Sequence, residues 1–236
     1  MAIKHLRSGL LSIDWARSVN FYLSREQETL APVDRAFSRI AVWSRALERA
    51  DSGNPALSFV RGVQSASLSV VVCSSAALYI ASAGSIRSIV ENGLYYSFFR
   101  EHPAELRTLI GQDGYYLSKS EIIQYHKTHT KDFKVLQEKT GFLLKLDKWY
   151  SKVSAIVHGQ IPGEWVNHTN LAEISHDQEM LDSLTGFFCE AEELLHILFL
   201  ITCGRALWDQ FLTQQKRILI AGTPGDWKSL LKIDGA

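Results

Sequence analysis

Apolar residues recur at helical spacing along most of this chain. The first clear stripe consists of five residues at three- or four-residue steps: Val33, Phe37, Ile40, Trp43 and Leu47. This spacing predicts an amphipathic helix over about 30–50, ended by the Asp-Ser-Gly-Asn-Pro run at 51–55. A longer helix is predicted over about 56–101, with a break near Gly62 or Gly84.

Shorter helical patterns follow. We expect a short helix over 104–110 and another over 118–128, whose opening at Ser118 and Glu121 has the Ser-x-x-Glu spacing of a capping box. A further helix is predicted over about 131–158, closed by Gly159 and Pro162. Its inward face is marked by five apolar residues: Phe142, Leu146, Trp149, Val153 and Ile156.

The longest predicted helix opens at His176 or Asp177, after a loop over 163–175, and continues to about Arg217. Its apolar stripe comprises Leu181, Leu184, Phe188, Ala191, Leu195 and Leu198. A turn at 223–226 precedes a short tail. Because no run alternates apolar and polar residues as a strand would, the predicted class is all-α, a helical bundle.

Three regions are expected from this pattern: an N-terminal helical extension over 1–55, a helical bundle over 56–217 and a C-terminal tail over 218–236. The segment 62–86 contains no charged residue and is long enough to span a bilayer. It also carries seven serines, which makes it only moderately hydrophobic. We therefore expect a buried core helix there and no membrane span.

Composition narrows the classes of function. The 236 residues include 25 basic and 25 acidic side chains, and this balance argues against a protein that coats nucleic acid through a general basic surface. This charge balance is compatible with a small basic site, such as one formed by a dimer. Three scattered cysteines without a Cys-x-x-Cys motif, and no secretory signal, favour a cytoplasmic protein with free thiols.

Common cofactor and metal motifs are absent from the sequence. It has no Walker A loop, no Gly-x-Gly-x-x-Gly, no Gly-x-Ser-x-Gly and no His-Glu-x-x-His. His126 and His129 are three residues apart, but no Asp, Glu or Cys is spaced to complete a metal site. We therefore expect neither a cofactor nor a bound metal.

A charged pair lies at the end of the least polar stretch. Arg87 and Glu91 are one helical turn apart and share a helix face. Charges held against apolar surroundings require polar partners. Two interpretations remain open: a guanidinium oriented by a carboxylate, able to clamp a phosphate or a partner's carboxylate, or a structural salt bridge.

A polar stripe marks one side of the predicted helix over 131–158. It consists of Asp147, Ser151, Ser154 and His158. A histidine beside hydroxyls and a carboxylate can act as a general acid or base. Alternatively, His158 is a helix-terminal histidine satisfied by a local carbonyl and favoured by the helix dipole.

Taken together, the Arg-Ser-Ile-Val-Glu run at 87–91 and the Ser-Ala-Ile-Val-His-Gly run at 154–159 resemble bacterial helical families of the HEPN-like type, over roughly residues 60–215. The resemblance implies a metal-independent ribonuclease of toxin–antitoxin or phage-defence systems, with an active site formed across a homodimer. The family's signature is an arginine followed, after four to six residues, by a histidine. In this chain the position expected for that arginine is occupied by Lys152, which is separated from His158 by five residues.

The resemblance also implies roles for individual residues. His158 would be the general acid or base, either Arg87 or Lys152 would stabilise the phosphorane, and Ser154 and Glu91 would orient them. The alternative hypothesis is a non-catalytic helical module that binds RNA, a nucleotide or a partner protein from the same operon. Under the nuclease hypothesis Arg87, Glu91 and His158 converge in one cleft. Under the alternative, Arg87 and His158 form a solvent-inaccessible polar latch between helices.

Overall fold

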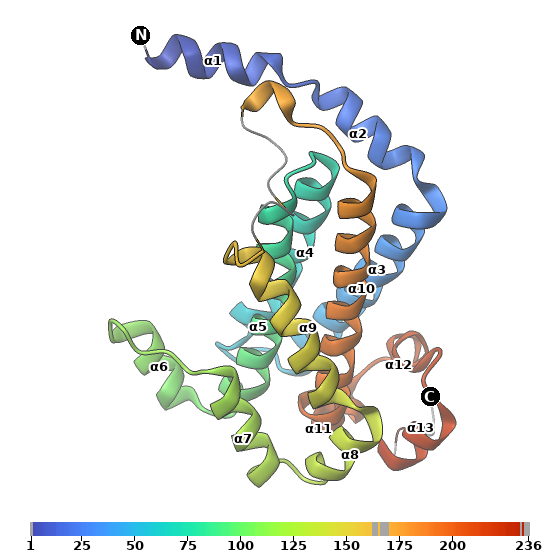
Figure 1. Ribbon diagram of the computed structural model, residues 1–236. Helices are drawn as coiled ribbons and strands as arrows, with labels where there is room; N and C mark the ends of the chain where they lie inside the picture. The colour runs from blue at the N-terminus through green and yellow to red at the C-terminus, as the bar shows by residue number, and fades with distance from the viewer. Residues whose placement is uncertain (1, 162–164, 166–169, 232, 234–236) are drawn as a thin grey trace.

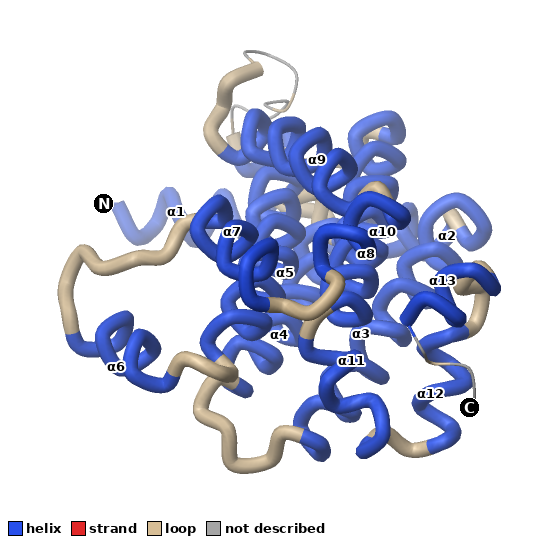
Figure 2. The backbone as a smooth tube through the Cα atoms, turned by 90° about the horizontal axis from the view of Figure 1, so that it is seen from below, coloured by secondary structure: helices blue, strands red, loops and turns tan. Residues whose placement is uncertain are grey.

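The computed structural model describes residues 2–161, 165, 170–231 and 233. These residues form helices joined by turns and loops, and no strand occurs among them (Figures 1 and 2). The all-α class and the helical bundle predicted from the apolar periodicity are therefore confirmed.

Five long helices build the bundle. They are α3 (Ala31–Ala50), α4 (Leu57–Ser75), α5 (Tyr79–Phe99), α9 (Phe142–Val157) and α10 (Gln178–Ile201). The shorter helices are α1 (Ala2–Ser12), α2 (Trp15–Ser24), α6 (Pro103–Gly111), α7 (Lys119–His129), α8 (Phe133–Thr140), α11 (Cys203–Leu207), α12 (Thr213–Ile220) and α13 (Gly225–Leu231). A π-helical turn at Glu26–Leu30 leads into α3, and 3-10 turns occupy Leu171–Glu173 and Trp208–Gln210.

Helix α5 lies at the centre of the bundle and packs against α4, α9 and α10, while α3 packs against α4 and α10 (Figure 1). The core between them is rich in aromatic side chains, including the fully buried Trp43, Phe188 and Phe199. Burying each such side chain contributes roughly 1.5–3 kcal/mol. The indole of Trp43 donates a hydrogen bond to Nδ1 of the buried His196 at 3.0 Å, so this polar pair inside the core is satisfied.

The predicted helix over 56–101 is two helices, and the predicted positions of its break are wrong. The chain turns back at 76–78, where Ala77 adopts a left-handed conformation with φ 59°, and α4 and α5 form an antiparallel hairpin. Gly62 lies inside α4, where an added Cβ would come within 2.5 Å of the Asn92 side chain. This glycine therefore permits close approach of α4 and α5 rather than a break.

Two other predicted helices were too long. Gly141, at φ +65°, ends α8 and begins α9, so the predicted helix over 131–158 is interrupted there. Asp177 caps α10 as expected, because its carboxylate accepts the backbone N–H of Met180 at 2.9 Å. That helix ends at Thr202 rather than continuing to Arg217, since Thr202 leaves helical geometry at φ −126° and ψ −112°.

The short predicted helices agree with the structure. Helix α6 matches the expected 104–110, and α7 begins with the expected capping box between Ser118 and Glu121. Pro162 lies outside the described residues, as does most of the first half of the predicted loop over 163–175. The predicted tail after the turn at 223–226 contains α13.

Helix α4 carries apolar side chains on part of its outer surface. Among the described residues it is the one helix long and apolar enough to cross a membrane by length and composition, and 33% of that stretch is buried. Leu68 and Val72 are exposed on it. The segment 62–86 is therefore not one buried core helix, because 62–75 belong to α4, which is only partly buried, and only 79–86 belong to α5. The absence of a membrane span and the cytoplasmic location stay predictions. Helix α1 extends away from the bundle (Figure 1).

Candidate functional site

The packing of α9 across α5 brings together the two polar segments found in the sequence. Arg87 and Glu91 lie one turn apart on α5, and Tyr150 lies on α9 about two turns before His158, which caps the C-terminal end of that helix. These four residues are joined by hydrogen bonds and are called the Arg87 cluster below. The structure thus brings Arg87, Glu91 and His158 together, as the nuclease hypothesis requires.

The end of α9 fixes the position of His158. Gly159 adopts φ +61°, its N–H donates to the carbonyl of Ile156 at 3.1 Å, and the N–H of Gln160 donates to the carbonyl of Ala155 at 2.8 Å. This pair of bonds is a Schellman motif, which glycine favours because it adopts positive φ without steric cost. His158 is therefore the last residue before a well-defined chain reversal, and its ring projects from the helix end.

Every nitrogen of the Arg87 guanidinium has a partner within the Arg87 cluster. Nε donates to Oε1 of Glu91 at 2.8 Å, and Nη2 donates to the Tyr150 hydroxyl at 2.7 Å. Nη1 lies 2.7 Å from Nε2 of His158. The Tyr150 hydroxyl in turn donates to the same carboxylate oxygen at 2.7 Å. The carboxylate and the phenol together orient the guanidinium toward the histidine.

The contact between Arg87 and His158 determines which imidazole nitrogen carries the proton. A guanidinium has donors and no acceptor, so Nε2 of His158 must accept the bond through its lone pair. An imidazole that accepts this bond carries its proton on Nδ1. Nε2 is consequently the nitrogen that can take up a proton when a ligand draws the guanidinium away.

Burial and charge act on the other groups of the Arg87 cluster. Burial acts to lower the pKa of Arg87, but hydrogen bonding to Glu91, the carboxylate charge and Tyr150 outweigh it, so the pKa is raised. Burial, followed by the hydrogen bond to Glu91, raises the pKa of Tyr150. Arg87 therefore stays cationic and Tyr150 stays a neutral phenol at physiological pH.

The Arg87 cluster is accessible to solvent. His158 is exposed, and the side chains of Arg87 and Glu91 are 21% and 38% exposed. The latch hypothesis predicts a mutual hydrogen bond between Arg87 and His158, which is present. It also predicts that both are inaccessible, which is not what the structure shows.

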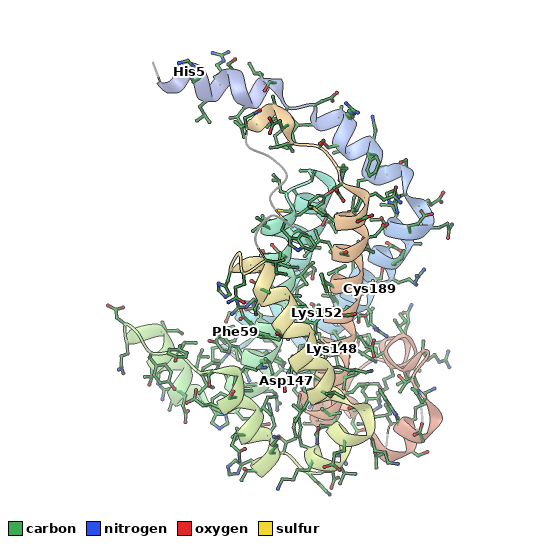
Figure 3. The ribbon with its side chains drawn as sticks, in the orientation of Figure 1. His5, Phe59, Asp147, Lys148, Lys152 and Cys189 are labelled. Carbon is green, nitrogen blue, oxygen red and sulfur yellow. The ribbon has the colours of Figure 1, made fainter. Side chains whose placement is uncertain are left out.

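Lys152 and Ser154 do not join the Arg87 cluster. Lys152 is six positions before His158, which places it about 120° away around α9. With Lys148, it lines a separate cavity of about 260 Å³ that faces α10 (Figure 3). The Ser154 hydroxyl is buried without a hydrogen-bond partner among the described residues, and only the backbone carbonyl of Ser154 contacts the N–H of His158, at 2.9 Å.

Two members of the site region were missed by sequence reasoning. Tyr150 falls within the predicted helix over 131–158, but nothing in its spacing links it to Arg87 and Glu91 across 59 or more residues. Lys119 lies with Nζ 4.7 Å from the Tyr150 ring centroid and pairs with Asp147 at 2.6 Å. The expected stripe on α9 is thus divided, because its Asp147 pairs with α7 while His158 contacts α5.

Comparison with known proteins gives no relative: no family model, no curated protein and no solved structure matches the chain. Among the residues that the structure describes, no group of three histidine, cysteine, aspartate or glutamate side chains is arranged to hold a metal ion.

Proposed function

We propose that this protein is a HEPN-like, metal-independent endoribonuclease, acting as a toxin-type effector in bacterial phage defence. The observation that supports this most is the exposed contact between Nη1 of Arg87 and Nε2 of His158. It joins a cation able to bind a phosphodiester to a base able to accept the 2′-hydroxyl proton. Glu91 and Tyr150 hold the cation in place.

In the proposed reaction, a non-bridging phosphate oxygen of RNA competes with His158 for Nη1 of Arg87. The freed Nε2 of His158 takes the proton from the 2′-hydroxyl, and the 2′-oxygen attacks the adjacent phosphorus. The bond from phosphorus to the 5′-oxygen breaks, that oxygen takes up a proton from water, and His158 returns its proton to the solvent. The products are a 2′,3′-cyclic phosphate and a 5′-hydroxyl, and Arg87 stabilises the charge that develops on the phosphorane.

The roles proposed for Lys152 and Ser154 differ from those implied by the resemblance. Lys152 faces another cavity, so Arg87 takes the role of phosphorane-stabilising cation. Ser154 influences His158 through the geometry of the helix end. Glu91 keeps its proposed role, because its carboxylate binds the guanidinium directly at 2.8 Å.

We further propose that the enzyme works as a cytoplasmic homodimer and is controlled by a partner protein from the same operon. A chain with 25 basic and 25 acidic residues has no excess charge to hold a long RNA. A dimer would bring two Arg87 clusters to one RNA, so that two guanidinium groups could contact its phosphates.

A second candidate function is supported by the hydrogen bonds that occupy all three nitrogens of the Arg87 guanidinium. Because Nε, Nη1 and Nη2 of Arg87 all have partners, the same residues can hold α5 and α9 together in a non-catalytic module. In that case removal of His158 would weaken folding and change no chemistry.

The two functions are separated by assays of RNA degradation and cell toxicity with His158→Ala. His5→Ala is the matched control, because His5 is also an exposed histidine and lies on α1, away from α9 (Figure 3). The nuclease predicts cleavage and toxicity for the wild type and His5→Ala, and their loss in a folded His158→Ala. Intact RNA with the wild type, together with a strong loss of stability in His158→Ala, would favour the latch.

A further inference from the structure

A cavity of about 390 Å³ opens directly beside the Arg87 cluster and shares Arg87, Glu91 and Tyr150 with it. It lies between α5, α9 and the segment that leads into α7, and it is called the tyrosine pocket below. Three tyrosines and three aliphatic side chains form most of its wall: Tyr95, Tyr116, Tyr150, Leu94, Leu117 and Ile122. Its volume is in the range of small-molecule sites.

The aromatic walls differ in how firmly they are held. Tyr95 packs edge-on against Phe59 and Phe99, with ring centroids 5.3 Å and 5.6 Å apart. Tyr150 is held by its hydrogen bonds and by the cations beside its ring. Tyr116, by contrast, is 72% exposed at the edge of the pocket. An aromatic ring this exposed has a face available for a ligand.

Cations lie beside these aromatic walls. Nζ of Lys119 is 4.7 Å from the Tyr150 ring centroid, and Cζ of Arg87 is 4.9 Å from it. Ser118 and Ser120 also line the pocket, although the Ser118 hydroxyl is engaged by Glu121 in the capping box. The pocket therefore offers flat apolar faces for a planar ring, a serine for its polar edge, and positive charge toward the Arg87 cluster.

This combination fits a nucleotide. Single-stranded nucleic acids are held by aromatic faces on which bases stack, next to cations that bind the backbone phosphate. We infer that the tyrosine pocket binds one unstacked nucleobase of the RNA substrate, with Tyr116 as the stacking face, while the phosphate of the same nucleotide contacts Arg87. The inference rests on the proposed function, whose site it completes.

The test compares the binding of two soluble probes to the intact chain. Adenosine 5′-monophosphate carries a base and a phosphate, and ribose 5-phosphate carries the phosphate without a base. Base stacking contributes about 1–3 kcal/mol by alanine substitution, so the first probe should bind about 5- to 150-fold more tightly by calorimetry. Tyr116→Ala should remove most of this preference.

Tyr115→Ala is the matched control, since this neighbouring tyrosine is half-buried and does not line the pocket. It should keep the wild-type preference. Equal binding of the two probes to the wild type, or no detectable binding of adenosine 5′-monophosphate, would overturn the inference. A preference that survives in folded Tyr116→Ala would overturn it as well.

The outcome is independent of cleavage, because neither probe has a phosphodiester bond. If the wild type cleaves RNA but binds both probes equally, the proposed nuclease function is supported and the proposed base-binding role of the tyrosine pocket is wrong. A preference for adenosine 5′-monophosphate in a protein that cleaves no RNA would support a nucleotide site and contradict the nuclease.

Discussion

Replacing Tyr150 by phenylalanine removes a single hydroxyl at the centre of the Arg87 cluster. The ring is retained, so its contacts with the Arg87 and Lys119 cations at 4.9 Å and 4.7 Å are kept. Two hydrogen bonds of 2.7 Å are lost, one from Arg87 and one to Glu91. The substitution therefore isolates what the hydroxyl contributes to joining α5 and α9.

Hydrogen bonds to charged groups contribute about 1.5–3 kcal/mol each when they are buried. Here the side chains of Arg87 and Glu91 are 21% and 38% exposed, so water replaces part of what is lost. We expect Tyr150→Phe to lower the free energy of unfolding by about 1–2 kcal/mol in total. For a chain of this size that is a drop in Tm of roughly 2–8 °C.

Thermal and urea unfolding followed by circular dichroism measure this change. Tyr116→Phe is the control, because Tyr116 is 72% exposed and its hydroxyl contacts no residue of the Arg87 cluster. It should leave the Tm unchanged. If Tyr150→Phe is as stable as Tyr116→Phe, the hydroxyl does not hold the guanidinium in solution, and the geometry proposed for Arg87 is refuted.

Three further predictions concern the scaffold. Gly93→Ala should lower the free energy of unfolding in urea by about 1–3 kcal/mol, because its Cβ would lie 2.3 Å from Cδ1 of Leu195. The control Gly84→Ala is on the same helix, where an added Cβ meets nothing within 4 Å, and it should raise the free energy of unfolding by about 0.5–1 kcal/mol. Gly159 has φ +61°, so Gly159→Ala should lower the free energy of unfolding by about 1 kcal/mol and should reduce RNA cleavage by displacing His158. Unchanged cleavage would show that the geometry of the helix end does not affect the site. Burial, with a smaller effect of the nearby His102 charge, lowers the pKa of His126 from 6.5 to about 4, so below pH 6.5 the unfolded chain takes up a proton that the folded chain excludes. Stability should therefore fall as the pH decreases from 6.5 toward 4, and between pH 7 and pH 5 the wild type should lose about 2 kcal/mol more than His126→Gln; parallel losses would contradict the assignment.

The helical class and most helix positions could be predicted because local signals determine them. The stripe over 33–47 repeats at steps of about one helical turn, the capping box at Ser118 lies within a single turn, and both agree with the structure. The turn at 76–78 could not be predicted in the same way. It occurs between serines and alanines that tolerate a helix, and tertiary packing of α4 on α5 selects the break.

The site was predictable in part for a similar reason. Arg87 with Glu91 and His158 with Gly159 are local patterns, and the need of a half-buried charge for partners linked them. The contribution of Tyr150 depends on how α5 crosses α9, which no spacing within either helix specifies. Lys152 matched a family spacing in sequence, but the helical repeat turns it toward α10.

The chemistry of the cut ends tests the central claim most directly. A 5′-labelled single-stranded RNA is incubated with the wild type and with His158→Ala in the presence of a metal chelator, and the new ends are identified by mass spectrometry. We predict a 2′,3′-cyclic phosphate and a 5′-hydroxyl, formed about 10²- to 10⁴-fold more slowly by His158→Ala. Equal rates for the two proteins, or ends carrying a 3′-hydroxyl and a 5′-phosphate, would contradict the proposed roles of Arg87 and His158.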